Sequence, residues 1–535
     1  MSADILCANS PKVFPHFAPS EPPSHLSLAR NTLFLTVGKL LGSSLYIMFG
    51  LVLPGFVDTD QNGVYALMGS LLFFGTMFAS FGIPVIVTRQ SARFPNQAGQ
   101  IYSDARLAML LGALVSSVLI TIYLYSESLY QGEPMGQLWV LLMLVIGIIF
   151  ADSMGYLGES LFQGFERMAS PAVVEAVSGL VRAGGATLAL ILLPQDYRIL
   201  GVFCMFLLGS ALRGWVLSHW VHTKLLPNET IPKSTLKNAW GMMKTSGFVA
   251  VFRILRMLRN RIDILLMGFL WVSMIPGVEG DVQSARGLYS QAMRVAAIFL
   301  TFTIAFNTAL FPRLARLTGG DPENLAKDRA ATKNLYGRAL RWQAFWVVPM
   351  AVGIFIYSDT VVGWFGDKYL YGDHENGVLH STSQVLKVLL ISMIADCISG
   401  PAGMLFLGVK ELERKVPKVA GVVLAISVVC NIILIPRYGI LGAAWASAIS
   451  ASAEFILKMT LIGLGFGNPI RILLRTIPYY FVAAAMFALL YFLNLGDKLL
   501  IGAPLGAAFY IVVCWYLRLV DPGVVKIIRK KLGRA

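Results

Sequence analysis

Asn431-Ile-Ile-Leu-Ile-Pro-Arg-Tyr-Gly-Ile-Leu-Gly-Ala-Ala-Trp445 joins two long apolar stretches, and this segment decides the fold. A similar segment, Leu193-Pro-Gln-Asp-Tyr-Arg-Ile-Leu-Gly-Val-Phe203, occurs earlier in the chain. Tyr197 and Tyr438 lie 241 residues apart, and so do Gly201 and Gly442. Two matched helix-turn-helix corners at one spacing indicate a duplicated membrane protein, and internal symmetry of this kind is typical of transporters.

The composition also indicates a membrane protein. Of the 535 residues, 56% are hydrophobic and only 14% are charged, and the mean hydropathy is +0.68. A soluble chain carries about 25% charged residues. Apolar runs of about 20 residues recur along the sequence, each long enough to cross a bilayer as a helix. The alternating pattern of an outer-membrane barrel is absent, so we expect helices.

The formal net charge of +15 does not indicate nucleic-acid binding, because the basic residues lie in short loops between apolar spans. Loop lysines and arginines set the orientation of a membrane protein and contact anionic lipid. The five cysteines are scattered and show no metal-binding spacing, so we expect neither a metal site nor a cofactor. The polar, proline-rich residues 1–28 lack the apolar core of a signal peptide and are predicted to form a disordered cytoplasmic tail.

The apolar runs predict about fourteen spans with both termini in the cytoplasm. Their approximate limits are 31–55, 63–88, 107–125, 137–160, 171–193, 199–221, 246–272, 287–311, 342–358, 384–408, 417–436, 440–463, 472–495 and 499–517. Seven basic residues lie in the cytoplasmic segment 313–341, and more lie in the loop 223–245 and the C-terminal tail. In this layout the outer segments contain only five basic residues: Arg198, Arg286, Lys368, Arg437 and Lys498.

The repeat contains six helices, so its two copies point the same way and are related about the membrane normal. Gly63-Val-Tyr65 opens the second span and Gly287-Leu-Tyr289 the eighth, while the fourth and tenth spans end at Gly164 and Gly408. We therefore expect an all-α polytopic protein with two six-helix lobes and two peripheral helices. The predicted units are the tail 1–28, an N-lobe 29–222, a linker 223–245, a C-lobe 246–463, helices thirteen and fourteen in 464–518, and a basic tail 519–535.

Three features resemble the polysaccharide transporter branch of the multidrug/oligosaccharidyl-lipid/polysaccharide exporter superfamily. They are Gly287-Leu-Tyr-Ser-Gln-Ala292 following Asp263-Ile-Leu-Leu-Met-Gly268, the Leu310-Phe-Pro312 helix end, and the 431–445 corner. The similarity covers about residues 28–520. It implies two six-helix lobes around a central cavity. It also implies movement of a lipid-linked oligosaccharide, usually on undecaprenyl pyrophosphate, from the inner to the outer leaflet.

The seventh predicted span concentrates charge. Arg256, Arg259 and Asp263 recur at i, i+3 and i+7, which places them on one face of a continuous helix, and Arg253 widens that face. A charge at the centre of a membrane helix costs about 2.5–3.5 kcal/mol, so these side chains should face a wet cavity or a partner. Guanidinium groups bind phosphate oxygens in a bidentate manner, which suits a pyrophosphate. The alternative is that Arg253 and Arg256 reach the inner surface while Arg259 pairs with Asp263.

Other embedded charges divide into site candidates and ion pairs. By the resemblance, Lys39 and Arg294 are cavity candidates, although Arg294 could instead reach the membrane surface. Asp263 and Asp396 are candidates for coupling to protons or sodium, Asp396 because it lacks an oppositely charged residue at i±3 or i±4. Glu454 with Lys458, and Glu175 with Arg182, are spaced as structural ion pairs.

The sequence therefore predicts a flippase for a lipid-linked oligosaccharide of a surface polysaccharide, such as a lipopolysaccharide or exopolysaccharide, in the cell membrane. Expected partners are that substrate, membrane lipids, and the glycosyltransferases and polymerase of the same pathway, without nucleic acid. A peptidoglycan-precursor flippase and a drug/cation antiporter are alternatives, but an antiporter would favour a carboxylate-rich cavity. A membrane glycosyltransferase or polysaccharide polymerase would need catalytic residues in a large outer loop, so we do not expect an enzyme. The glycan, the coupling ion and the oligomeric state are left open.

Overall fold

A computed structural model of the chain describes residues 45, 48–132, 136–227, 231–318, 325–408, 415–466, 473–496 and 498–520. These residues form helices joined by turns, without a strand, which confirms the all-α prediction. Nine helices within the described ranges are long and apolar enough to cross a membrane, so the chain is a multi-pass membrane protein. One of the nine, Val416–Ile462, turns back at Gly439. The number fourteen stays a prediction, because most of the first predicted span lies outside the described residues.

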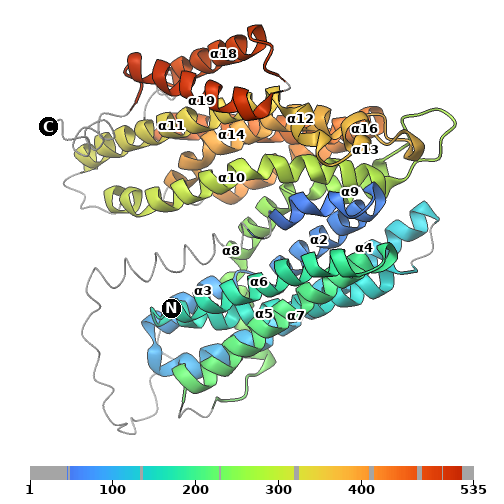
Figure 1. Ribbon diagram of the computed structural model, residues 1–535. Helices are drawn as coiled ribbons and strands as arrows, with labels where there is room; N and C mark the ends of the chain where they lie inside the picture. Colours follow the sequence, from blue (N-terminus) through green and yellow to red (C-terminus); the bar gives the residue numbers. More distant parts are fainter. Residues whose placement is uncertain are drawn as a thin grey trace.

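The helices form two bundles (Figure 1). The N-terminal bundle contains α2 (Thr59–Ser80), α3 (Ile83–Arg93), α4 (Ala98–Gln131), α5 (Leu138–Gly164), α6 (Ala169–Leu192) and α7 (Arg198–Trp220). The helix α8 (Leu236–Arg259) leads into the C-terminal bundle, which contains α9 (Ile262–Leu270), α10 (Val282–Thr318), α11 (Leu325–Ile356), α12 (Ser358–Gly363), α13 (Asp367–Tyr371), α14 (Thr382–Gly408) and α16 (Val416–Phe466). We call the bundles the N-lobe and the C-lobe.

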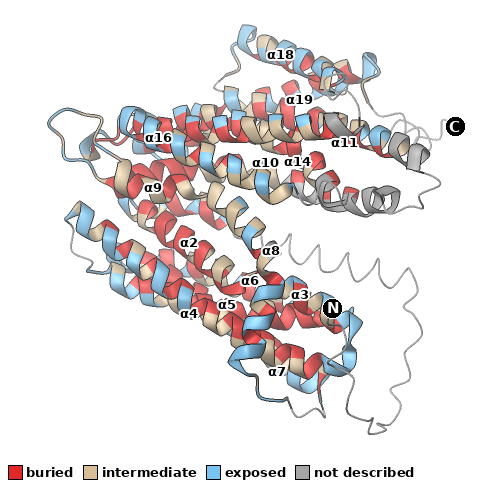
Figure 2. Ribbon diagram, turned by 180° about the vertical axis from the view of Figure 1, so that it is seen from behind, coloured by how far each residue is buried: buried red, intermediate tan, exposed pale blue. Residues whose placement is uncertain are grey.

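Each lobe has its own apolar core. Leu142, Ile149 and Phe203 lie in the N-lobe core, whereas Leu288 and Leu389 lie in the C-lobe core. In Figure 2 the buried residues follow the inward faces of both bundles. The helices α18 (Ile477–Phe492) and α19 (Leu499–Tyr516) lie at the edge of the C-lobe against α11, in the peripheral place expected for them (Figure 1).

The two sequence corners share a close helix contact at a glycine, but only the C-lobe corner has a residue with positive φ. Gly439 adopts φ 55° and ψ −132°, values that a β-carbon would oppose, and it turns α16 back on itself. Gly442 then lies against the carbonyl group of Leu434, eight residues earlier, and a β-carbon at this glycine would overlap it. In the N-lobe corner a β-carbon at Gly201 would overlap Leu193, also eight residues earlier. Each corner therefore uses the glycine four residues after its tyrosine to bring two helices together.

Two predicted spans are broken. The segment 63–88 forms α2 and α3, separated at Phe81 and Gly82, which both have positive φ. The segment 246–272 forms α8 and α9, separated at Asn260 and Arg261. The prediction of one continuous face on the seventh span was therefore wrong beyond Arg259, because the break gives Asp263 a different direction from the α8 arginines.

The lobes meet where α2 crosses α10. A β-carbon at Gly63 would overlap the carbonyl oxygen of Gln283, and one at Gly287 would overlap that of Thr59. The contact is reciprocal, because Thr59 and Gln283 each precede their glycine by four residues. This is the pattern of a two-fold axis between matched helices. From this crossing the lobes diverge away from the end that carries α12 and α13 (Figure 1).

Candidate functional site

The arginines of α8 differ in their surroundings. Arg253 is half-buried and Arg256 is exposed, and neither forms an ion pair among the described residues. Arg259, at the last position of α8, has a side chain that is only 10% exposed. One turn of helix thus separates an accessible guanidinium group from an enclosed one.

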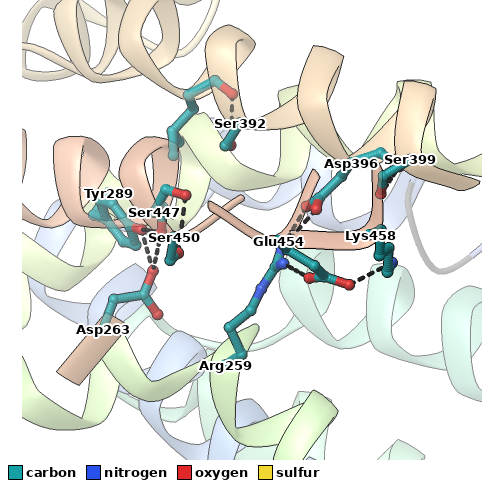
Figure 3. A network of polar contacts seen from close by, with 11 residues as sticks. Arg259, Asp263, Tyr289, Ser392, Asp396, Ser399, Ser447, Ser450, Glu454 and Lys458 are labelled. Carbon is teal, nitrogen blue, oxygen red and sulfur yellow. Dashed lines mark hydrogen bonds and ion pairs between the residues drawn. The ribbon is translucent and has the colours of Figure 1, made fainter. Parts of the chain in front are cut away.

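Two carboxylates hold Arg259 in place (Figure 3). Its Nη2 atom donates to both oxygens of Asp396 on α14, at 2.7 and 2.6 Å. Its Nη1 atom donates to Glu454 on α16. Glu454 also pairs with Lys458 at 2.5 Å, so the predicted i, i+4 pair is confirmed. The result is a C-lobe cluster of two cations and two anions, Arg259, Lys458, Asp396 and Glu454, drawn from three helices.

Asp263 is not the partner of Arg259, which corrects the expected pairing. The break at Asn260 and Arg261 places Asp263 at the start of α9, where it is fully buried. There its carboxylate accepts hydrogen bonds from the Tyr289 hydroxyl group and the Ile264 backbone N–H, with the Ser447 hydroxyl group at 3.4 Å (Figure 3). Asp396, for which the sequence showed no nearby partner, instead binds Arg259, which lies 137 residues away in the chain.

A pocket opens beside the C-lobe cluster. It is bounded by α8, α14 and both arms of α16, and its lining residues are Phe252, Arg256, Arg259, Gly403, Val416, Val419, Ala420, Val423, Glu454 and Lys458. Arginine and lysine supply the hydrogen-bond donors of this lining, while valines and a phenylalanine supply its apolar wall. A cationic lining of this kind favours an anionic group attached to an apolar one. Within the described residues no group of three or more histidine, cysteine, aspartate or glutamate side chains could hold a metal ion.

Arg294 lies elsewhere, at the contact between the lobes. It projects from α10 with its guanidinium carbon 4.9 Å from the ring centre of Tyr65 on α2. Its Nη1 atom donates to Asn62 at 2.8 Å, to Gln291 at 2.7 Å and to the Gly50 carbonyl group at 3.3 Å. Lys39, the other cavity candidate, lies outside the described residues.

A second buried charge cluster, in the N-lobe, was only partly foreseen. The expected Glu175–Arg182 pair is present at 3.1 Å. Arg213 on α7, which sequence reasoning did not place in a site, pairs with Glu159 at 2.6 Å, with Glu175 at 2.7 Å and with Asp152 at 3.8 Å. Its spacing gave a usable signal, because Arg213 follows Gly201 by the same twelve residues that separate Glu454 from Gly442.

The assignment of Arg286 to an outer loop was wrong. Arg286 lies in α10 and is fully buried, and it pairs with Glu127 on α4 at 2.5 Å. It also donates to the Ile264 carbonyl group at 3.0 Å. Because α4 belongs to the N-lobe and α10 to the C-lobe, this pair joins the lobes near their point of contact. Sequence reasoning missed it because the partners are 159 residues apart.

Comparisons with known proteins extend this description. A family model described as polysaccharide biosynthesis protein matches residues 28–318, and one described as lipid II flippase MurJ matches residues 283–497. The chain is 24% identical over 438 residues to a Haloferax volcanii protein named "Probable low-salt glycan biosynthesis flippase Agl15", covering 81% of this chain and 83% of the relative. It is 22% identical over 453 residues to "Probable flippase AglR" of the same organism, covering 84% and 86%.

Solved structures show the same fold. The structure described as lipid II flippase MurJ in an inward closed conformation aligns with a TM-score of 0.68 at 15% identity, covering 92% of this chain and 99% of that one. A transporter of the MOP superfamily from Pyrococcus furiosus aligns with a TM-score of 0.53 at 13% identity, covering 82% and 95%. At these low sequence identities, the similarity shows a shared arrangement of the helices and nothing more.

Proposed function

The chain belongs to the polysaccharide biosynthesis protein family, and from this premise we propose that it is a flippase for a lipid-linked oligosaccharide. The named relatives support the proposal, because both Haloferax volcanii proteins are described as flippases and one of them as a flippase of glycan biosynthesis. The substrate would be an oligosaccharide joined through pyrophosphate to a polyprenyl lipid such as undecaprenol. Its polar head would cross from the inner to the outer leaflet while the lipid tail stays in the bilayer.

The observation that carries this proposal is the position of Arg256. Its guanidinium group lines the pocket, is exposed, and forms no ion pair among the described residues. An arginine in this situation can bind two oxygens of a phosphate group without first leaving a carboxylate. We assign Arg256 as the principal contact for the pyrophosphate, with Arg253 beside it on the same helix.

Arg259 contributes differently. Asp396 and Glu454 occupy its terminal nitrogens, so a phosphate would have to compete with two carboxylates. The guanidinium group nonetheless lines the same pocket and adds positive potential behind Arg256. Arg294 and Lys39 complete the proposed set of cationic contacts, Arg294 at the contact between the lobes.

Transport would proceed by alternating access. The lobes diverge toward one end (Figure 1), and we propose that this end faces the cytoplasm, because the loop lysines and arginines are concentrated there. The substrate head would enter there, and rocking of the lobes about their contact would then open the other end. Asp263 and Asp396 are the proposed groups for coupling to protons or sodium, since each is a carboxylate at the depth of the membrane helices.

Transport in proteoliposomes tests the proposal. The probe is a fluorescent disaccharide on polyprenyl pyrophosphate, and its arrival in the outer leaflet is measured with a membrane-impermeant quencher. We expect Arg256→Ala to lower the initial rate at least tenfold and Arg256→Lys to restore part of it, because lysine keeps the charge but loses the bidentate geometry. Lys237→Ala is the matched control, since Lys237 is an exposed cation at the other end of α8. An Arg256→Ala rate equal to that of the control would disprove the assignment.

The same assay separates the alternatives. A peptidoglycan-precursor flippase would move the natural pentapeptide precursor faster than the disaccharide probe. A drug/cation antiporter would move cationic dyes and leave both lipids in place. A membrane glycosyltransferase or polymerase would lengthen the glycan, which mass spectrometry of the recovered lipid would detect.

A further inference from the structure

One N-lobe side chain holds three groups of the C-lobe. Asn62 on α2 is fully buried. Its Nδ2 atom donates to the Gly287 carbonyl group at 3.1 Å and to the Tyr369 hydroxyl group at 2.9 Å. Its Oδ1 atom accepts from Nη1 of Arg294 at 2.8 Å. Both amide hydrogens and the amide oxygen are therefore used across the contact between the lobes, and we call these three interactions the Asn62 bonds.

The Asn62 bonds depend on the close approach of the lobes. Gly63, the next residue, lies against the backbone at Gln283, and Gly287 lies against the backbone at Thr59. The Gly287 carbonyl group that Asn62 binds therefore lies beside this close contact between α2 and α10. If the lobes separated at the end that carries α12 and α13, the Asn62 bonds would all break. The Asn62 bonds therefore stabilise only the conformation in which this end is closed.

Arg294 takes part in the Asn62 bonds and is also a proposed contact for the anionic head of the substrate. It lies twelve residues into α10, about 18 Å along the helix from its first residue at the closed end. A charged oxygen is a stronger acceptor for a guanidinium group than the neutral amide oxygen of Asn62. An anion that reaches Arg294 from the open end would therefore compete directly with the Asn62 side chain for Nη1.

We propose that Asn62 couples anion binding at Arg294 to opening of the opposite end of the transporter. When a phosphate group takes the Nη1 hydrogen bond, Asn62 loses one of its three partners and the closed contact at Gly63 and Gly287 weakens. The population then shifts toward the conformation open at the other end. This inference rests on the proposed function, because it takes Arg294 as a contact for the anionic head.

Distances between spin labels test the coupling in the full-length protein in nanodiscs, with its five natural cysteines replaced. The labels are placed at Asp196 in the N-lobe and Glu375 in the C-lobe, which are both exposed. The probe is inorganic pyrophosphate, whose binding is measured separately by calorimetry. In the otherwise native protein we expect pyrophosphate to bind and to increase the long-distance population at least twofold. In Asn62→Ala we expect the long distance between the labels to be populated before pyrophosphate is added. Pyrophosphate should then increase that population only slightly.

Two control variants distinguish coupling from general weakening of the contact. Thr59→Val removes a cross-lobe hydrogen bond to Asp373, 2.5 Å long, whereas the hydrogen bonds of Arg294 go to Asn62, Gln291, Ser290 and the Gly50 carbonyl group. For Thr59→Val we expect a longer distance between the labels without pyrophosphate, and a normal increase when pyrophosphate is added. Gly69→Ala adds a methyl group to α2 where there is open space, so it should match the otherwise native protein.

The outcomes are decisive in both directions. Loss of the response in Asn62→Ala, with its retention in Thr59→Val, supports the coupling. A normal response in Asn62→Ala, or an equal loss in Thr59→Val, overturns it. If pyrophosphate binds without changing any distance, this inference fails while the proposed anion site stands. If pyrophosphate does not bind at all, the proposed anion site fails and the inference fails with it.

Discussion

The charge clusters of the two lobes occupy matched positions but are built differently. Asp152 and Asp396 each precede the glycine that ends their helix by twelve residues, and Arg213 and Glu454 each follow their corner glycine by twelve. Where the N-lobe has an arginine, the C-lobe therefore has a glutamate. The C-lobe obtains its arginine from α8 instead, as Arg259. The duplication conserves the places of charged residues while the sign at one of them has changed.

The central arginines of the two clusters also differ in their surroundings. The Arg213 side chain is only 3% exposed, and its guanidinium group lies over the Tyr156 ring at 4.4 Å. The Arg259 side chain is 10% exposed, and it lines the pocket together with Glu454. An arginine that is covered by a ring stabilises the bundle, whereas one that borders a pocket can also act on a ligand. We infer that the N-lobe cluster is structural and that the C-lobe cluster supports the proposed site.

The largest loss of stability should follow from Arg213→Ala, which would leave Asp152, Glu159 and Glu175 without their shared cation. Removing one partner of a buried ion pair costs about 3–5 kcal/mol. We expect a large fall in folded protein, measured as the monodisperse fraction in detergent and as the unfolding temperature. Arg213→Lys should recover part of this loss. Normal unfolding of Arg213→Ala would show that the N-lobe cluster is not structural.

A smaller loss is expected for Arg259→Ala, because Glu454 keeps Lys458 as a partner and only Asp396 is left without a cation. Leaving a buried hydrogen-bonding group unsatisfied costs about 1–3 kcal/mol, and more when the group is charged; the partial exposure of Asp396 lowers this cost. The double variant Arg259→Ala/Asp396→Asn should regain most of the stability in the same unfolding measurement. If it regains transport as well, Arg259 serves only as a counter-ion. If stability returns without transport, while Asp396→Asn alone still transports, the guanidinium group itself is needed in the pocket.

The repeat could be predicted from the sequence, whereas the break in the seventh span could not. The corners at Tyr197 and Tyr438 and the opening glycines Gly63 and Gly287 were recognisable, because a repeat at fixed spacing is a property of the sequence itself. The break between α8 and α9 was not, since neither glycine nor proline marks Asn260 and Arg261. Apolar residues flank Arg259-Asn260-Arg261 on both sides, so the span 246–272 was predicted as one helix.

The partners of buried charges were harder to predict than their presence. Arg259 binds residues 137 and 195 positions away, and spacing along one helix carries no information about them. Local pairs such as Glu454 with Lys458 followed from the helical repeat. The interactions that define the candidate site are long-range, so they required the packing of α8, α14 and α16.

The smallest change in stability is expected at an exposed ion pair, which lies outside both charge clusters. Lys387 binds both oxygens of Asp359 at 3.2 and 3.1 Å, at the end of the C-lobe that carries α12. The Asp359 side chain is 62% exposed, and exposed pairs contribute about 0–1 kcal/mol. We expect Lys387→Ala to change the unfolding temperature at pH 7 far less than Arg259→Ala does.

The pH dependence gives this last prediction a direction. Partial burial would raise the pKa of Asp359, but the hydrogen bonds from Ser383 and Lys387 outweigh it, so the pKa lies below its ordinary value. A carboxylate with a lowered pKa stabilises the fold above its unfolded-state pKa of about 3.9, and this contribution is lost as the pH falls through the folded-state pKa. The small difference between Lys387→Ala and the unsubstituted protein should therefore be present at pH 7 and vanish in acid. A difference that grew in acid would show that Lys387 acts through a group other than Asp359.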